Sequence, residues 1–174
     1  MPCEDDHVTK RRRIVPDASV MLPAFFSEQI EHKGAGFDLT RSAKPIADAI
    51  RLRDVKAFAP DVLLPEFMGS AYRKCSPRRG RSEIALELAD RQVSDFLLLP
   101  IVYVSSRDLA EDAWELAREC GVPPPDSWYL ACAMYYDAEL WVSHSHEDRF
   151  PEQALKAWPR VYLLTERRFG DVTV

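Results

Sequence analysis

The stretch Ile14-Val15-Pro16-Asp17-Ala18-Ser19-Val20 marks the point where a buried strand gives way to a helix. Two β-branched residues begin the strand, and Pro16 ends it because proline has no backbone N–H for further pairing. Apolar residues at helical spacing follow from Ser19 to Phe26, and the stretch Lys33-Gly34-Ala35-Gly36 ends this helix. The sequence therefore predicts a strand followed directly by a helix, with Asp17 at the junction.

The same alternation continues along the chain. Further helices are expected over residues 42–57, from Pro65, over residues 82–96, from Ser105 or Ser106, and from Asp126. Further strands are expected over residues 61–64, 101–104, 139–142 and 161–164. Strands that alternate with helices form a parallel sheet with helices on both of its faces. We therefore predict an α/β protein with a three-layer α/β/α architecture around a central, mostly parallel sheet.

Length and composition are typical of one soluble domain. The chain has 174 residues, of which 47% are hydrophobic and 29% are charged. We expect a flexible basic arm over residues 1–13 and a single domain over residues 14–174. The longest apolar stretch, Phe96–Val104, contains a proline and is too short to cross a bilayer. Because the arm also lacks the apolar segment of a signal peptide, we expect a cytoplasmic protein with no membrane partner.

Three acidic residues follow expected strands or open expected helices: Asp17, Glu66 and Asp126. The carboxyl ends of parallel strands line the ligand crevice of an open sheet, so these side chains are expected to lie together. Carboxylates brought together repel one another unless a cation neutralises them, and hard oxygen ligands suit Mg²⁺ or Mn²⁺. Each residue alone has a simpler explanation, since acidic side chains commonly cap helix N-termini. Their joint placement favours a metal site that hydrolyses phosphodiesters.

These residues resemble the motifs of the PIN-domain family. Asp17-Ala18-Ser19-Val20 is similar to the family's opening motif, Pro65-Glu66-Phe67 to its second acidic motif, and Asp126-Ser127 to its third. The resemblance runs from Ile14 to about Leu164. It implies a metal-dependent ribonuclease that uses Mg²⁺ or Mn²⁺, with Asp17, Glu66 and Asp126 as catalytic and metal-binding residues. Many members are VapC-like toxins of toxin–antitoxin pairs, so a homodimer and a cognate antitoxin are expected partners.

The fourth acidic position of the family departs from its usual Thr-x-Asp pattern. Ser143 stands in place of the threonine, and Ser145 in place of the aspartate. Glu147 is the favoured fourth acid because Ser145-His146-Glu147 keeps the spacing, and Asp148 is the alternative. Without either residue three carboxylates remain, which weakens a second ion site. We expect the hydroxyl of Ser19 or Ser143 to assist by hydrogen bonding to the substrate.

The segment His144-Ser145-His146 offers a different metal site. In an extended segment the two rings point to the same side, and Glu147 follows them. No third nitrogen or sulfur ligand lies nearby in the sequence, so a dedicated zinc site is the less favoured interpretation. A role in phosphate binding or proton transfer, and a simple surface loop, are the other interpretations.

A basic run follows the Glu66 helix. The net charge of −5 excludes a uniformly basic surface, but it allows a local basic patch. Arginine binds phosphate oxygens through two parallel hydrogen bonds, and Tyr72 is available to stack on a base. We therefore expect RNA contacts from this run, against the alternative of a solvated loop. The residues are Arg73, Lys74, Arg78, Arg79 and Arg81.

Two apolar groups contain more large side chains than one helix face can bury. Most of them are expected in the core, and the remainder are expected to form a homodimer or antitoxin interface. The residues of the two groups are Phe25, Phe26, Trp128, Tyr129, Tyr135, Tyr136 and Trp141, together with Leu22.

The sequence thus favours a Mg²⁺- or Mn²⁺-dependent endoribonuclease, with the toxin of a type II toxin–antitoxin pair as one version of that function. The alternative is a catalytically inactive PIN-like module for RNA binding or assembly, which the missing Thr-x-Asp motif supports. A phosphatase with Asp17 as nucleophile is a further rival. It is disfavoured because Ser19 stands where that mechanism needs a second aspartate.

Overall fold

The computed structural model describes residues 11–32, 35–76, 84–143 and 150–171. Its centre is a five-stranded sheet in the order β5-β4-β1-β6-β7, with all neighbouring strands parallel. The strands are β1 (Arg13–Pro16), β4 (Lys56–Pro60), β5 (Ile101–Val104), β6 (Glu139–Val142) and β7 (Val161–Leu163). A separate antiparallel hairpin is formed by β2 (Gln29–His32) and β3 (Ala35–Asp38).

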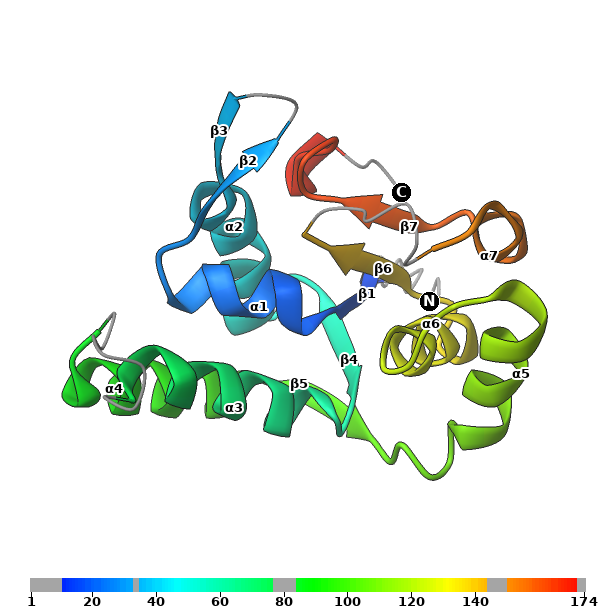
Figure 1. The fold of residues 1–174 in the computed structure, drawn as a ribbon, viewed down its shortest axis with the longest axis horizontal. Coiled ribbons are helices and arrows are strands. Elements are labelled where there is room, and N and C mark those ends of the chain that lie inside the picture. Colours follow the sequence, from blue (N-terminus) through cyan, green and yellow to red (C-terminus); the bar gives the residue numbers. More distant parts are fainter. Residues whose placement is uncertain (1–10, 33–34, 77–83, 144–149, 172–174) are drawn as a thin grey trace, which may run out of the picture.

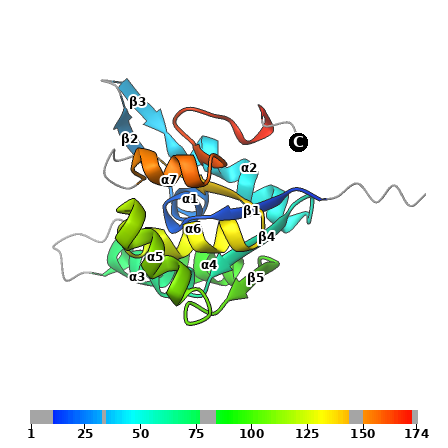
Figure 2. The ribbon, with the colours of Figure 1, turned by 90° about the vertical axis from the view of Figure 1, so that its right-hand side faces the viewer.

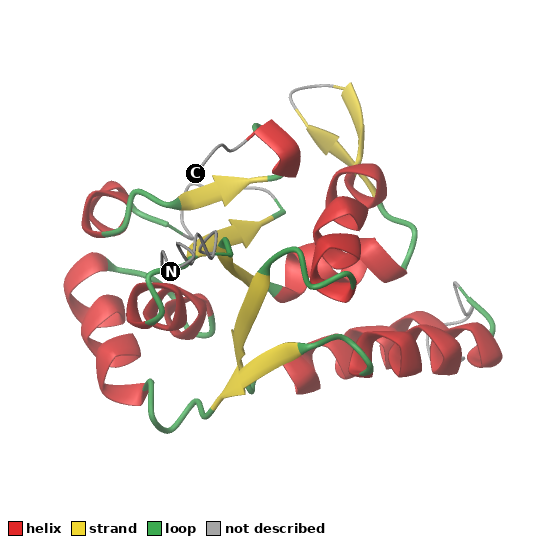
Figure 3. Ribbon diagram, turned by 180° about the vertical axis from the view of Figure 1, so that it is seen from behind, coloured by secondary structure: helices red, strands yellow, loops and turns green. Residues whose placement is uncertain are grey.

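Helices cover both faces of the sheet, which confirms the predicted three-layer α/β/α class (Figure 1). One face carries α1 (Ala18–Phe25), α2 (Leu39–Arg51), α3 (Leu63–Cys75) and α4 (Leu86–Leu97). The other face carries α5 (Ala110–Cys120), α6 (Asp126–Tyr135) and α7 (Glu152–Ala157), which Figure 2 shows side by side. A short 3-10 helix, η2 (Phe169–Asp171), follows β7. The view from behind in Figure 3 shows the sheet strands between these two groups of helices.

The middle strands of the sheet are buried, as parallel sheets covered on both faces require. Ile14 and Val15 of β1 and Trp141 of β6 have no exposed surface. Phe67 of α3 stacks on Phe96 of α4 with ring centroids 3.8 Å apart, which holds these two helices together. Of the aromatic residues divided between core and interface in the prediction, Phe26, Tyr129 and Trp141 are buried in the core, whereas Tyr135 is 69% exposed.

The second strand of the chain differs from its prediction. The strand expected over residues 61–64 is wrong, because β4 spans Lys56–Pro60 and α3 begins at Leu63. Asp61 forms the turn between them, and its carboxylate accepts a hydrogen bond of 2.9 Å from the backbone N–H of Ser106. Pro65 is the third residue of α3, where a helix does not need its backbone N–H.

Three helices also begin or end at residues that differ from those predicted. The helix expected over residues 42–57 is α2, which begins and ends earlier than predicted. The helix expected from Ser105 or Ser106 begins at Ala110, and the one expected over residues 82–96 begins at Leu86. The hairpin of β2 and β3 and the helix α7 were not predicted.

The last residues of the expected basic arm belong to the domain. Arg13 begins β1, and the guanidinium of Arg12 donates three hydrogen bonds of 2.6–2.9 Å to the carboxylate of Glu139. Glu139 is 4% exposed and also accepts a hydrogen bond from the indole of Trp141. This buried ion pair ties the entry of β1 to β6. The rest of the expected arm, residues 1–10, lies outside the described residues.

No helix among the described residues is both long and apolar enough to cross a membrane.

The buried pair between Arg12 and Glu139 is expected to stabilise the fold measurably. The change Glu139→Ala leaves the Arg12 charge and the Trp141 N–H without their buried acceptor, so we expect the free energy of unfolding to fall by about 3 kcal/mol. Urea denaturation measures this loss. Glu152→Ala is the matched control, since Glu152 pairs with Lys156 at 2.7 Å on the surface and its loss should cost under about 1 kcal/mol. Equal losses in the two variants would contradict this assignment.

Candidate active site

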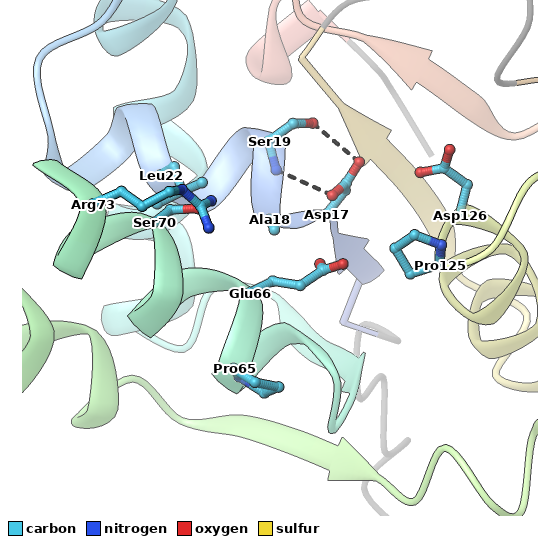
Figure 4. Close-up of a pocket in the computed structure, with 10 residues that line it drawn as sticks. All are labelled: Asp17, Ala18, Ser19, Leu22, Pro65, Glu66, Ser70, Arg73, Pro125 and Asp126. Atoms are coloured by element: carbon cyan, nitrogen blue, oxygen red, sulfur yellow. Dashed lines mark hydrogen bonds between the residues drawn. The ribbon is translucent and has the colours of Figure 1, made fainter. Parts of the chain in front are cut away.

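The three predicted carboxylates line one pocket at the carboxyl edge of the sheet. Asp17 follows β1, Glu66 is in the first turn of α3, and Asp126 is the first residue of α6. The pocket has a volume of about 590 Å³, and Figure 4 shows the three side chains around it. Its remaining lining residues are Ala18, Ser19, Leu22, Pro65, Ser70, Arg73 and Pro125.

Asp17 is held by the helix that it begins. It is the N-cap of α1, and its two carboxylate oxygens accept hydrogen bonds of 3.0 Å from the backbone N–H and the hydroxyl of Ser19. The helix expected from Ser19 thus begins one residue earlier, at Ala18. Asp17 therefore has a structural role as well as a place in the pocket. Asp17 is 4% exposed, and these hydrogen bonds fix the position of its side chain.

Ser19 and Ser143 link the first helix to β6. The backbone N–H of Ser143 donates to the hydroxyl of Ser19 at 3.1 Å, and the backbone N–H of Asp17 donates to the carbonyl of Trp141 at 2.9 Å. Ser19 lines the pocket, as predicted for a substrate contact. Ser143 is only 1% exposed, so it supports the orientation of Ser19 rather than presenting its own hydroxyl to solvent.

Glu66 is held by a residue that the sequence analysis missed. The hydroxyl of Tyr129 donates a hydrogen bond of 2.6 Å to the carboxylate of Glu66. Burial raises the pKa of Tyr129 well above its ordinary value, and the charges of Asp17 and Glu66 raise it further. The hydrogen bond to Glu66 acts in the same direction, against a smaller opposing effect of the Ala18 backbone. Tyr129 is therefore a permanent donor to Glu66 at neutral pH.

The sequence contains one weak indication that Tyr129 lies near the site. It lies three residues after Asp126 on α6, and residues three apart share a helix face. The partner of its hydroxyl depends on where α3 packs, which no local pattern shows.

All three carboxylates stand at helix N-termini, which offsets part of their mutual repulsion. The N-terminus of a helix carries about half a positive charge, worth about 0.3–1 kcal/mol to a nearby anion. Asp17 caps α1, Glu66 is in the first turn of α3, and Asp126 begins α6. The interpretation of each acid as a helix-terminal residue and its interpretation as a site residue are thus compatible.

The donor set of the pocket fits Mg²⁺ or Mn²⁺ in kind. Carboxylate oxygens are the hard ligands that these ions prefer, and Mg²⁺ commonly needs only one or two of them, with water and substrate phosphate completing its shell. In the described part of the chain no group of three or more His, Cys, Asp or Glu side chains is close enough to surround one ion. A shared ion would therefore be held by one or two carboxylates.

Arg73 provides positive charge at the edge of the pocket. It lies about two turns beyond Glu66 on α3, lines the pocket, and donates a hydrogen bond of 2.6 Å to the hydroxyl of Ser70. Arg73 is exposed to solvent. The pocket thus combines carboxylates with one arginine, an arrangement suited to a phosphodiester beside a cation.

Several predicted site residues lie outside the described residues. These are Arg78, Arg79 and Arg81 of the basic run, and His144, Ser145, His146, Glu147 and Asp148 of the fourth acidic segment.

Comparison with known proteins gives a similar fold. No family model matches the chain, and no curated protein matches it. A chain of a solved toxin–antitoxin complex from Klebsiella pneumoniae is similar in structure, with a TM-score of 0.53 and 18% sequence identity. The similarity covers 87% of this chain and 97% of that chain. At this level of identity it shows a common fold.

The proton on Tyr129 gives the site a testable pH dependence. Because the folded pKa lies above the unfolded value of about 10, the contribution of this group to stability is complete below about pH 10 and is lost as pH rises through the folded pKa. We expect Tyr129→Phe to lessen the fall of stability between about pH 10 and pH 12. Urea unfolding over that range measures it.

The slope of the unfolding free energy against pH is the informative quantity. Loss of the hydrogen bond to Glu66 shifts the variant's whole stability curve but does not change this slope. Burial also raises the pKa of Tyr103, to about 12, and this effect is present in both proteins. Parallel curves for wild type and variant would contradict a raised pKa at Tyr129.

Proposed function

We propose that this protein is a PIN-like endoribonuclease that depends on Mg²⁺ or Mn²⁺. The observation that carries the proposal is the meeting of Asp17, Glu66 and Asp126 in one pocket, from three segments far apart in the sequence. The parallel sheet brings the N-termini of these helices to one edge, and all three acids at that edge line the same pocket. A divalent ion bound there would supply charge neutralisation and an activated water.

The residues of this chain have distinct tasks in the proposed reaction. Asp17 and Asp126 are the ion-binding carboxylates, and Ser19 fixes the orientation of Asp17 through two hydrogen bonds. Glu66, which accepts the hydrogen bond of Tyr129, is the third acid and is proposed to contact the ion or an ion-bound water. Arg73 orients a phosphate of the RNA at the edge of the pocket. Glu147, or else Asp148, is proposed as the fourth acid.

A role in a toxin–antitoxin pair is the biological version of this proposal. The fold similarity to a chain of the Klebsiella pneumoniae complex supports it, together with the resemblance to VapC-like proteins. In this version the partners are RNA, a cognate antitoxin and a second copy of the chain, in the cytoplasm.

The second candidate is a PIN-like module that binds RNA without cleaving it. Two observations favour it: the missing Thr-x-Asp pattern at Ser143, and the absence of a three-ligand cluster among the described side chains. The two candidates differ in one measurable property, which is metal-dependent cleavage.

The cleavage test compares wild type with Asp17→Asn and Asp126→Asn on single-stranded RNA, with Mg²⁺ or Mn²⁺ and with EDTA. Loss of an ion-binding carboxylate should lower the cleavage rate about 100-fold, since metal catalysis contributes several kcal/mol to the transition state. Asparagine retains the N-cap of α1, so Asp17→Asn should still fold. Asp48→Asn on the exposed face of α2 is the control and should cleave normally. Cleavage that survives EDTA or both site variants would refute the proposal, and RNA binding without cleavage would favour the module.

The RNA-binding test concerns the basic run. Replacement of Arg73, Arg78, Arg79 and Arg81 by alanine should weaken binding to uncleaved RNA and flatten its salt dependence. Each arginine that neutralises a phosphate of a single strand contributes about 0.7 to the slope of log K against log salt. Fluorescence anisotropy at several salt concentrations measures this. The control also removes four charges and replaces Arg51, Arg107, Arg118 and Arg168, which are exposed and lie outside the basic run. An equal effect of both sets would show that only net charge matters.

A further inference from the structure

A second hollow lies on the helical layer formed by α5, α6 and α7, the three helices seen side by side in Figure 2. Its volume is about 440 Å³, and it shares no lining residue with the acidic pocket. The first residue of α6, Asp126, lines the acidic pocket, whereas Ala131, Met134 and Tyr135 of the same helix line this hollow. The hollow is therefore a separate surface, connected to the acidic pocket through one helix.

The floor of this hollow is apolar and partly open to solvent. Leu116 and Ala131 are buried at its base, while Met134 is 37% exposed and Tyr135 is 69% exposed. Tyr135 packs edge-on against Tyr136, with ring centroids 5.0 Å apart, which fixes its ring at the surface. Aromatic and methionine side chains held in this way are enriched where proteins contact partners.

The edge of the hollow is acidic. Asp112, Glu115 and Glu119 line it, and their spacing on α5 places them along one side of that helix. Glu119 pairs with Arg118 at 2.9 Å on the surface, whereas Asp112 and Glu115 form no ion pair with any residue that the structure describes. The described lining of the hollow contains no lysine or arginine. The hollow is thus negatively charged along one edge, and its described lining carries no positive charge.

We infer that this hollow, which is lined by Asp112, Glu115, Leu116, Met134 and Tyr135, is the docking site of a basic amphipathic helix of a partner protein. The apolar side of such a helix would cover Met134 and Tyr135, and its lysines or arginines would face Asp112 and Glu115. This is the groove-binding mode in which anchors on one helix face fill a hydrophobic hollow. The carboxylates repel nucleic acid, so this surface does not extend the proposed RNA-binding run.

The test uses the full chain and a labelled peptide of about 18 residues, long enough to form a helix, with lysines on one face and leucines on the other. We expect binding by fluorescence anisotropy, with an affinity that falls as salt is added. Asp112→Asn with Glu115→Gln should weaken binding about fivefold, since two exposed charge pairs are lost. Met134→Glu should weaken it at least as much, because it places a charge on the apolar floor.

The matched control is Glu87→Gln with Asp95→Asn, which makes the same charge change on the exposed face of α4 and should leave the affinity unchanged. A peptide with glutamates in place of lysines, and a scrambled peptide without an apolar face, should bind weakly. Circular dichroism establishes that each variant is folded.

Three results would overturn the inference. Equal loss in the α5 and α4 double variants would show attraction by net charge alone. Equal binding of the glutamate or scrambled peptide would show that neither charge nor helix shape matters. Self-association that Tyr135→Lys abolishes in sedimentation experiments would assign this surface to a second copy of the chain.

Discussion

The mutual repulsion of three carboxylates is the constraint on which the arrangement of this site depends. Asp17, Glu66 and Asp126 are brought to one pocket by three separate segments. Because these carboxylates are partly buried, water screens their mutual repulsion less than it screens the repulsion between charges on the surface. The fold offsets the repulsion by placing each acid at the N-terminus of a different helix. This concentration of negative charge is the feature on which the proposed metal-assisted chemistry depends.

Hydrogen bonds fix the orientation of the Asp17 and Glu66 side chains in the pocket. Ser19 occupies both oxygens of Asp17, and Ser143 in turn fixes Ser19 through its backbone N–H. Tyr129 occupies one oxygen of Glu66 from the helix that Asp126 begins. These neutral donors orient Asp17 and Glu66 without themselves cancelling the charge of either carboxylate.

The sequence predicted the layers and the three acids because both follow from local patterns. Strand–helix alternation implies a parallel sheet, and Asp17 and Asp126 stand at element junctions that composition and proline placement reveal. Glu66 was placed after the wrong strand, yet it reaches the pocket because it still lies in the first turn of α3. The hydrogen bond from Tyr129 and the buried pair of Arg12 with Glu139 were missed, since both join elements distant in the sequence. Such contacts depend on strand order and helix packing, which one sequence does not display.

The most direct test of the account is an anomalous diffraction measurement on crystals of the protein soaked in Mn²⁺. We expect a peak in the acidic pocket, about 2.1 Å from a carboxylate oxygen of Asp17 or Asp126, that is absent in crystals of Asp17→Asn. A pocket without a peak, or a peak at another cluster of oxygens with the acidic pocket empty, would contradict the claim that the acidic pocket is a metal site.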